Sequence, residues 1–108
     1  MKDNLVKTEI GQRIRQLRLL SDLTQAEFAE AIDISINFLS EIENGKKGVS
    51  GDTLAKICRC LNTSADFILF GKQEKRISFL ESANALSIEE LETTIRYLQA
   101  LIEMKKIL

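Results

Sequence analysis

The sequence predicts an all-α fold, in which a bundle of five helices is followed by a C-terminal helical extension. Apolar residues recur at steps of three and four positions, which is the spacing of one face of a helix. A hydrophobic fraction of 44% is ordinary for a soluble protein and allows a real core. Each helical pattern starts at a hydroxyl side chain, which can cap a helix N-terminus. These candidate caps are Thr8, Thr24, Ser35, Ser50, Ser64 and Ser87.

The first helix is expected over residues 8–20, with Thr8 as its N-cap. Its apolar face would hold Ile10, Ile14, Leu17 and, at the end, Leu20. Arg13 and Arg15 lie on or beside the polar side of this helix, where we expect them to be solvated.

The second helix is expected to begin after Thr24 and to run to about residue 32. Thr24 and Glu27 have the spacing of a capping box, in which each side chain bonds the backbone N–H of the other residue. Its inward residues would be Phe28, Ala29 and Ile32. Asp33 follows in a tight turn, at a position that needs a left-handed backbone, which Asp tolerates.

The third helix is expected over about residues 35–44, with Ser35 as its cap. Its inward residues would be Phe38, Leu39 and Ile42. Asn44-Gly45 would end it, because glycine readily takes the left-handed conformation of a helix C-terminus. The face left free by the apolar residues carries small and polar side chains, as a helix that lies in a DNA major groove requires.

Two more short helices complete the expected bundle. Ser50 would cap a helix that ends at Asn62, with Leu54, Ile57, Cys58 and Leu61 inward. Ser64 would cap a helix over residues 65–70, which Gly71 ends. Its apolar run would close the core.

The remainder of the chain reads as a linker over residues 72–86, followed by a long helix over about residues 88–106. Residues 77–85 can form a short helix within this linker, with Phe79, Leu80 and Ala83 on one face. Ser87 and Glu90 have the spacing of a second capping box.

The long helix carries an apolar stripe with the three-four spacing of paired helices. The stripe comprises Ile88, Leu91, Ile95, Leu98, Leu101 and Ile102. Because an exposed stripe of this size is costly, it needs a partner. A homodimer through this helix is favoured, and the alternative is that the helix folds back on its own bundle.

Composition excludes several kinds of chemistry. The chain has no histidine, so neither histidine-based acid/base catalysis nor a His-ligated metal site is expected. Cys58 and Cys60 are two positions apart, unlike a zinc pair or a redox motif, and we expect them to be small core residues in a reducing cytoplasm.

No phosphate-cradling glycine loop or nucleophile-and-base set is present, so we expect neither an enzyme nor a cofactor. Without an apolar signal segment or a membrane-spanning run, a cytoplasmic location is expected.

Net charge weighs against DNA binding. The chain has 15 basic and 16 acidic residues, whereas phosphate contacts usually make a DNA-binding protein basic. Residues 81–92 hold four glutamates and no cation, however. Acidic residues in the C-terminal part of the chain oppose DNA binding less than acidic residues on a DNA-reading helix would.

Residues 8–71 resemble the Xre group of helix-turn-helix regulators, which are related to phage lambda repressor and Cro. The resemblance rests on an ordered set: Ile14, Leu17 and Arg18, then residues 23–29, then Ser35, Leu39, Ser40 and residues 42–46, then Leu54 and Leu61. It implies a compact five-helix, lambda-repressor-like bundle, typically dimeric, that binds operator DNA. Residues 1–71 would then be the DNA-binding domain, 72–86 a linker, and 87–108 a dimerisation helix.

The resemblance also implies roles for single residues. Gln25 opens the second helix, where the family contacts phosphate and sometimes a base. The exposed positions of the third, or recognition, helix would be Ser35, Ile36, Asn37, Ser40 and Glu41. Asn44, Lys46 and Lys47 follow it, where the family clamps phosphate. Arg18 and Glu43 match a family ion pair that joins the first helix to the end of the third.

Side-chain chemistry agrees in part with these roles. Asn37 can bond an adenine, and Ile36 can touch a thymine methyl group. Glu41 repels phosphate, and its useful base partner is the cytosine amino group. The sequence therefore favours a dimeric repressor on an inverted-repeat operator in double-stranded DNA. The rival hypothesis is a protein-interaction module, whose C-terminal helix binds a partner regulator or a toxin.

Overall fold

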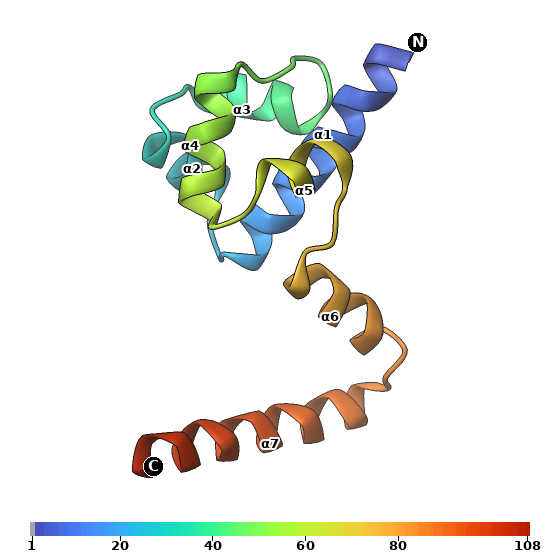
Figure 1. Cartoon of the computed structure of the whole chain (residues 1–108), viewed down its shortest axis with the longest axis vertical. Helices are drawn as coiled ribbons and strands as arrows, with labels where there is room; N and C mark the ends of the chain where they lie inside the picture. Colours follow the sequence, from blue (N-terminus) through green and yellow to red (C-terminus); the bar gives the residue numbers. More distant parts are fainter. Residues whose placement is uncertain (1) are drawn as a thin grey trace. The chain divides into compact units, whose positions relative to one another are not determined.

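The computed structural model describes the backbone of residues 2–108 and the side chains of residues 6–108. Seven helices and no strand are found there, which confirms the all-α prediction. The chain divides into two compact units, of which the first ends at Glu74 and the second begins at Lys75. The first unit holds α1 (Lys2–Leu20), α2 (Gln25–Ala31), α3 (Ile36–Glu43), α4 (Gly51–Leu61) and α5 (Ala65–Phe70) (Figure 1). The second holds α6 (Lys75–Ala83) and α7 (Ile88–Ile107).

Five of the six predicted N-caps are confirmed. The side-chain oxygens of Thr24, Ser35, Ser50, Ser64 and Ser87 each accept a hydrogen bond from the backbone N–H three residues later. The predicted start of the first helix is wrong, because α1 begins at Lys2 and Thr8 lies inside it. Residues 2–7 contain neither glycine nor proline, so nothing in them interrupts the helix upstream of Thr8.

The core of the first unit is built around α1, which packs on α3, α4 and α5, while α2 packs on α3. The buried apolar residues are Ile14, Leu17, Phe28, Ala29, Ile32, Leu39, Ile42, Ile57, Leu61, Phe67 and Ile68. Three expected inward residues are exposed instead. Leu20 and Phe70 stand at helix ends, and Cys60 lies on the outer side of α4, two positions from the half-buried Cys58.

Two glycines let α1 approach the end of α3 closely. A Cβ atom on Gly11 would lie 2.3 Å from the carbonyl oxygen of Ile42. Gly45 takes the left-handed conformation with φ +77°, and a Cβ atom there would lie 2.5 Å from Oγ1 of Thr8. Neither position has room for a side chain. Asp33 is left-handed as predicted, with φ 57°.

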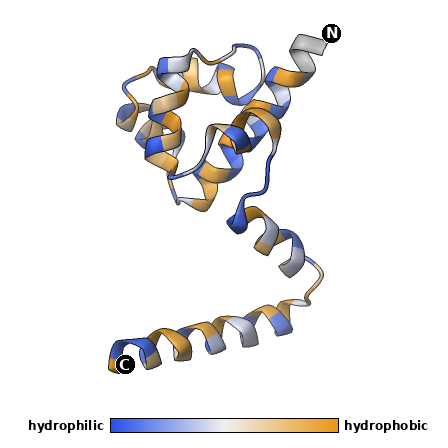
Figure 2. Ribbon diagram, viewed as in Figure 1, coloured by the Kyte–Doolittle hydropathy of each residue, from blue (hydrophilic) through white to orange (hydrophobic). Residues whose placement is uncertain are grey.

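The second unit has no residue in α6 or α7 that is buried. The predicted short helix is confirmed as α6, although it begins at Lys75 rather than residue 77 and ends at Ala83. Figure 2 shows hydrophobic residues along the length of α7. None of the helices in the described part of the chain combines the length and apolar character needed to cross a membrane.

Candidate nucleic-acid interface

The α2–turn–α3 unit forms a helix-turn-helix. Phe28 and Ala29 of α2 and Leu39 and Ile42 of α3 are all buried, while α2 and α3 pack on each other. The turn between them is fixed by the backbone N–H of Ile34, which donates to the carbonyl oxygen of Ala29 at 3.0 Å. The inner face of α3 is therefore committed to the core, and its remaining face is available to a ligand.

The structure exposes the first turn of α3 most. Ser35, Ile36 and Asn37 are exposed, and Ile36 keeps half of its surface in solvent although it is apolar. Ser40 and Glu41, one turn later, are half-buried. An exposed isoleucine next to an exposed asparagine offers one apolar and one hydrogen-bonding group to the edge of a base pair.

The C-terminal end of α3 turns into a basic loop. The backbone N–H groups of Lys46 and Lys47 donate to the carbonyl oxygen of Glu41 at 2.8 and 3.2 Å. The side chains of Asn44, Lys46 and Lys47 are exposed, and Nδ2 of Asn44 lies 3.4 Å from Oγ of Ser40. Two cationic side chains and an amide are thus exposed at the C-terminal end of α3.

Arg18 and Glu43 join α1 to the end of α3 in a buried ion pair. Nε of Arg18 lies 2.7 Å from Oε2 of Glu43, and Nη2 lies 3.0 Å from Oε1. Nη1 of Arg18 donates to the carbonyl oxygen of Leu23 at 2.8 Å. Two parallel hydrogen bonds between a guanidinium and a carboxylate fix orientation as well as charge.

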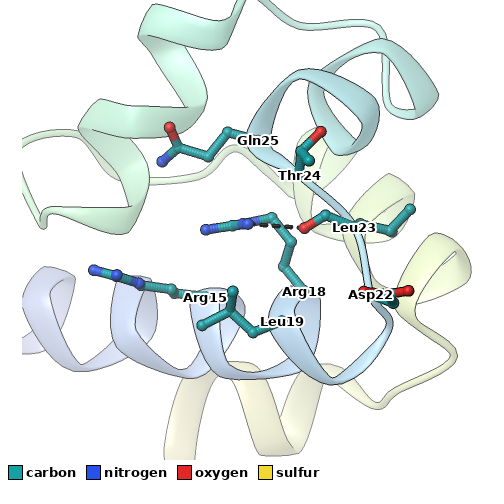
Figure 3. Close-up of a pocket in the computed structure, with 7 residues that line it drawn as sticks. All are labelled: Arg15, Arg18, Leu19, Asp22, Leu23, Thr24 and Gln25. Atoms are coloured by element: carbon teal, nitrogen blue, oxygen red, sulfur yellow. Dashed lines mark hydrogen bonds between the residues drawn. The ribbon is translucent and has the colours of Figure 1, made fainter.

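Gln25 extends this network to α2. Its Nε2 donates to Oε1 of Glu43 at 3.1 Å, so one carboxylate binds groups from two other helices. No local sequence pattern predicts this bond, because the two residues are 18 positions apart and meet only through packing. Gln25, Arg15 and Arg18 extend in the same direction along one pocket (Figure 3). The half-buried Gln25 is therefore fixed near an exposed arginine, Arg15.

The expectation that Arg13 is solvated is wrong. Its Nε donates to the carbonyl oxygen of Ile68 at 2.9 Å, and its Nη2 donates to that of Leu69 at 3.1 Å. These carbonyls lie in the last turn of α5, where backbone acceptors lack helical partners and a cation is favoured. Arg13 is thus a structural cap for α5, whereas Arg15 is exposed as expected.

The predicted dimerisation stripe is exposed on the isolated chain. Five of its members are between 44% and 77% exposed: Ile88, Ile95, Leu98, Leu101 and Ile102. Leu91 is half-buried. A pocket with an almost wholly apolar lining lies between α6 and α7, formed by residues that include Phe79, Leu86, Leu91, Ile95 and Leu98.

Comparison with known proteins identifies the family to which this helical arrangement belongs. The sequence model of the helix-turn-helix family matches residues 14–68, which include the whole of α2, α3 and α4. The chain belongs to the Xre/lambda-repressor-like helix-turn-helix family. Several of its relatives are named as transcriptional regulators, and the family is one of DNA-binding regulators of transcription.

Two curated relatives illustrate the similarity. The antitoxin PezA of Streptococcus pneumoniae is 47% identical over 55 residues, which are 51% of this chain and 35% of that protein. The control protein C.BamHI of Bacillus amyloliquefaciens is 32% identical over 78 residues, which are 68% of this chain and 96% of that protein. The chain thus matches about a third of the antitoxin but nearly all of the control protein.

A solved structure extends the similarity to most of the chain. The clp gene regulator ClgR from Corynebacterium glutamicum is 27% identical, with a TM-score of 0.56, over 93% of each chain. Members of this family are regulators of transcription and are typically not enzymes. Among residues 6–108, no cluster of three metal-ligating side chains occurs. Burial raises the pKa of the Cys58 thiol, which favours its unreactive protonated form.

Proposed function

We propose that this chain is a dimeric repressor that reads an inverted-repeat operator with α3. The observation that carries this proposal is the exposed Ile36–Asn37 pair, which lies in the chain between groups that can bind phosphate. Gln25 lies at the start of α2, and Lys46 and Lys47 follow α3. Base-reading groups flanked by phosphate-binding groups form the arrangement that sets both register and sequence preference.

The roles follow from the chemistry of each side chain. Asn37 would bond N6 and N7 of an adenine, and Ile36 would contact a thymine methyl group. Asn44, Lys46 and Lys47 would bind phosphates. Ser35 and Ser40 can bond either base or phosphate oxygens, and the most useful base partner of Glu41 would be a cytosine amino group.

Dimerisation would come from the second unit. Because α6 and α7 contain no buried residue, they lack a core of their own, and a pair of helices without one is marginal in water. The α7 stripe of a second copy would cover the stripe and pocket of the first. Two recognition helices would then enter major grooves about one helical turn apart, roughly 34 Å. Occupying a promoter in this way would block transcription.

Selection of DNA tests this function. The full chain is used to enrich duplexes from a random pool at low and at high salt. We expect an inverted repeat with half-sites about one turn apart, bound less tightly as salt rises. If no sequence is enriched, the proposal that the chain binds an operator is wrong.

Variants then test the reading helix on the enriched duplex. Asn37→Ala should weaken binding roughly 5- to 150-fold for each half-site, because a bidentate base contact is worth about 1–3 kcal/mol. Gln25→Ala should weaken it on all sequences alike. Asn84→Ala, an exposed asparagine in the second unit, is the matched control and should leave affinity unchanged. Binding that survives Asn37→Ala would assign base reading to another element.

A second candidate function is a protein-interaction module. The similarity to a protein named as an antitoxin favours it, together with the net charge of −1. In this case the stripe and pocket of the second unit would bind a partner regulator or a toxin. Association through apolar surfaces should respond little to salt, whereas DNA binding should weaken steeply.

A further inference from the structure

The N-terminal part of α1 lies against the loop that connects α3 to α4. The close contacts of Gly11 with the carbonyl oxygen of Ile42, and of Gly45 with Thr8, leave no room for side chains between these segments. Helix α1 continues beyond them toward Lys2. The position of its N-terminal part relative to the end of the recognition helix is therefore fixed by backbone packing.

Lys7 lies at the point where α1 passes this loop. A Cβ atom on Gly48 would stand 3.7 Å from Cε of Lys7, which is ordinary contact distance, so the end of the lysine stem reaches Gly48. Gly48 directly follows Lys46 and Lys47. Lys7 and Gly11 are four positions apart and share a helix face, whereas Glu9 is two positions away and points elsewhere.

The positive charges of Lys7, Lys46 and Lys47 have no carboxylate partner within the described part of the chain. Among residues 6–108, no carboxylate forms an ion pair with Lys7, Lys46 or Lys47. Glu43 is committed to Arg18 and Gln25. Like charges held near each other repel, and a polyanion that binds them together removes this cost.

We propose that Lys7 binds a DNA phosphate beside those bound by Lys46 and Lys47. The three lysines form a phosphate clamp at the end of the recognition helix, with one member supplied by α1. This inference rests on the proposed DNA-binding function. It adds a contact from outside the residues matched by the family model, which begin at position 14.

The salt dependence of binding tests the clamp. The dissociation constant of the full chain for the enriched duplex is measured between about 50 and about 200 mM salt. Lys7→Ala should reduce the slope of log K against log salt by about 0.9 per subunit, because one fewer counterion is released. Lys7→Arg keeps the charge and should keep the slope.

Lys56→Ala is the matched control. It removes the same unit of charge from the same domain, but Lys56 lies on α4 and pairs with Asp52 at 3.6 Å. Its slope should equal that of the unsubstituted chain. A thermal unfolding curve for each variant separates a lost contact from a lost fold.

Three results would overturn the inference. An unchanged slope and an unchanged affinity for Lys7→Ala would mean that Lys7 touches no phosphate, while the proposed DNA binding would stand. A weaker affinity with an unchanged slope would assign Lys7 a structural role. If the unsubstituted chain enriches no duplex, the DNA-binding function itself fails, and the clamp fails with it.

Discussion

The guanidinium of Arg18 and the carboxylate of Glu43 are both almost wholly buried, with side chains 7% and 2% exposed. Their two hydrogen bonds connect the last turn of the core helix α1 to the last residue of α3. Because Gln25 also donates to Glu43, the same carboxylate positions a side chain proposed to contact DNA. One ion pair therefore links stability of the bundle to geometry of the interface.

Breaking this ion pair should destabilise the bundle strongly. We expect Arg18→Met alone, or Glu43→Leu alone, to lower the free energy of unfolding by about 3–5 kcal/mol, because each leaves a buried charge without its partner. The double variant should lose much less than the sum of the two, since no unpaired charge remains. Urea unfolding measures all three. Additive losses would show that the two charges are not coupled.

Replacing Gly45 should be costly, in contrast to replacing Gly51. In Gly45→Ala, the new Cβ would lie 2.5 Å from Oγ1 of Thr8, and the backbone has φ +77°. We expect a loss of at least about 1 kcal/mol. Gly51 begins α4 and has no atom within 4 Å of its Cβ position, so Gly51→Ala should be neutral or slightly stabilising. Thermal unfolding of the two variants makes the comparison, and equal melting temperatures would contradict it.

The capping box of α2 should make stability depend on pH. The backbone N–H and the hydroxyl of Thr24 lower the pKa of Glu27 from its ordinary value. A pKa that is lower in the folded state adds stability above the unfolded pKa, and this stability is lost as pH falls through the folded pKa. Glu27→Gln keeps the side-chain oxygen but removes the charge. Its melting temperature should fall below that of the unsubstituted chain at about pH 6, and the two should converge near pH 3.

Glu30→Gln controls for the general loss of a negative charge from α2. Glu30 is exposed on the same helix and caps no terminus. Its melting temperature should follow that of the unsubstituted chain over the whole pH range. A difference between Glu27→Gln and the unsubstituted chain that persists at pH 3 would mean that the charge of Glu27 is not the cause.

The features that could be predicted from the sequence are local ones. A cap involves residues three positions apart, so Thr24 with Glu27 and Ser87 with Glu90 were readable without any knowledge of the fold. The left-handed Asp33 was readable for the same reason, because its conformation depends on the short turn around it. Such signals placed the boundaries of the middle helices within one or two residues.

The features that could not be predicted depend on packing between distant segments. Arg13 bonds carbonyls 55 and 56 positions away, and no local pattern distinguishes it from the exposed Arg15. The approach of the Lys7 side chain to Gly48 likewise depends on the packing of α1 against the end of α3 and the loop that follows it. Thr8 is the opposite case, because its local pattern predicts a cap but the helix continues on both sides of it.

Dimerisation through α7 gives the last prediction. Leu98 belongs to the exposed stripe and also lines the pocket between α6 and α7. In a symmetric dimer Leu98→Asp places a charge in the interface twice, and each buried leucine is worth about 1.5–3 kcal/mol. We therefore expect the dissociation constant of the dimer to rise at least about 100-fold. Analytical ultracentrifugation should show a dimer for the unsubstituted chain and a monomer for Leu98→Asp.

The bundle itself should survive this change, because every buried apolar residue lies at or before Ile68. The residues proposed to read DNA would then be intact on a monomer, which can bind only one half-site. Its affinity for the inverted repeat should fall toward that for a single half-site, since the second contact is no longer intramolecular. Gln99→Asp adds the same charge at an exposed polar position of α7 and should remain dimeric. A Leu98→Asp chain that stays dimeric would assign the self-association to another surface.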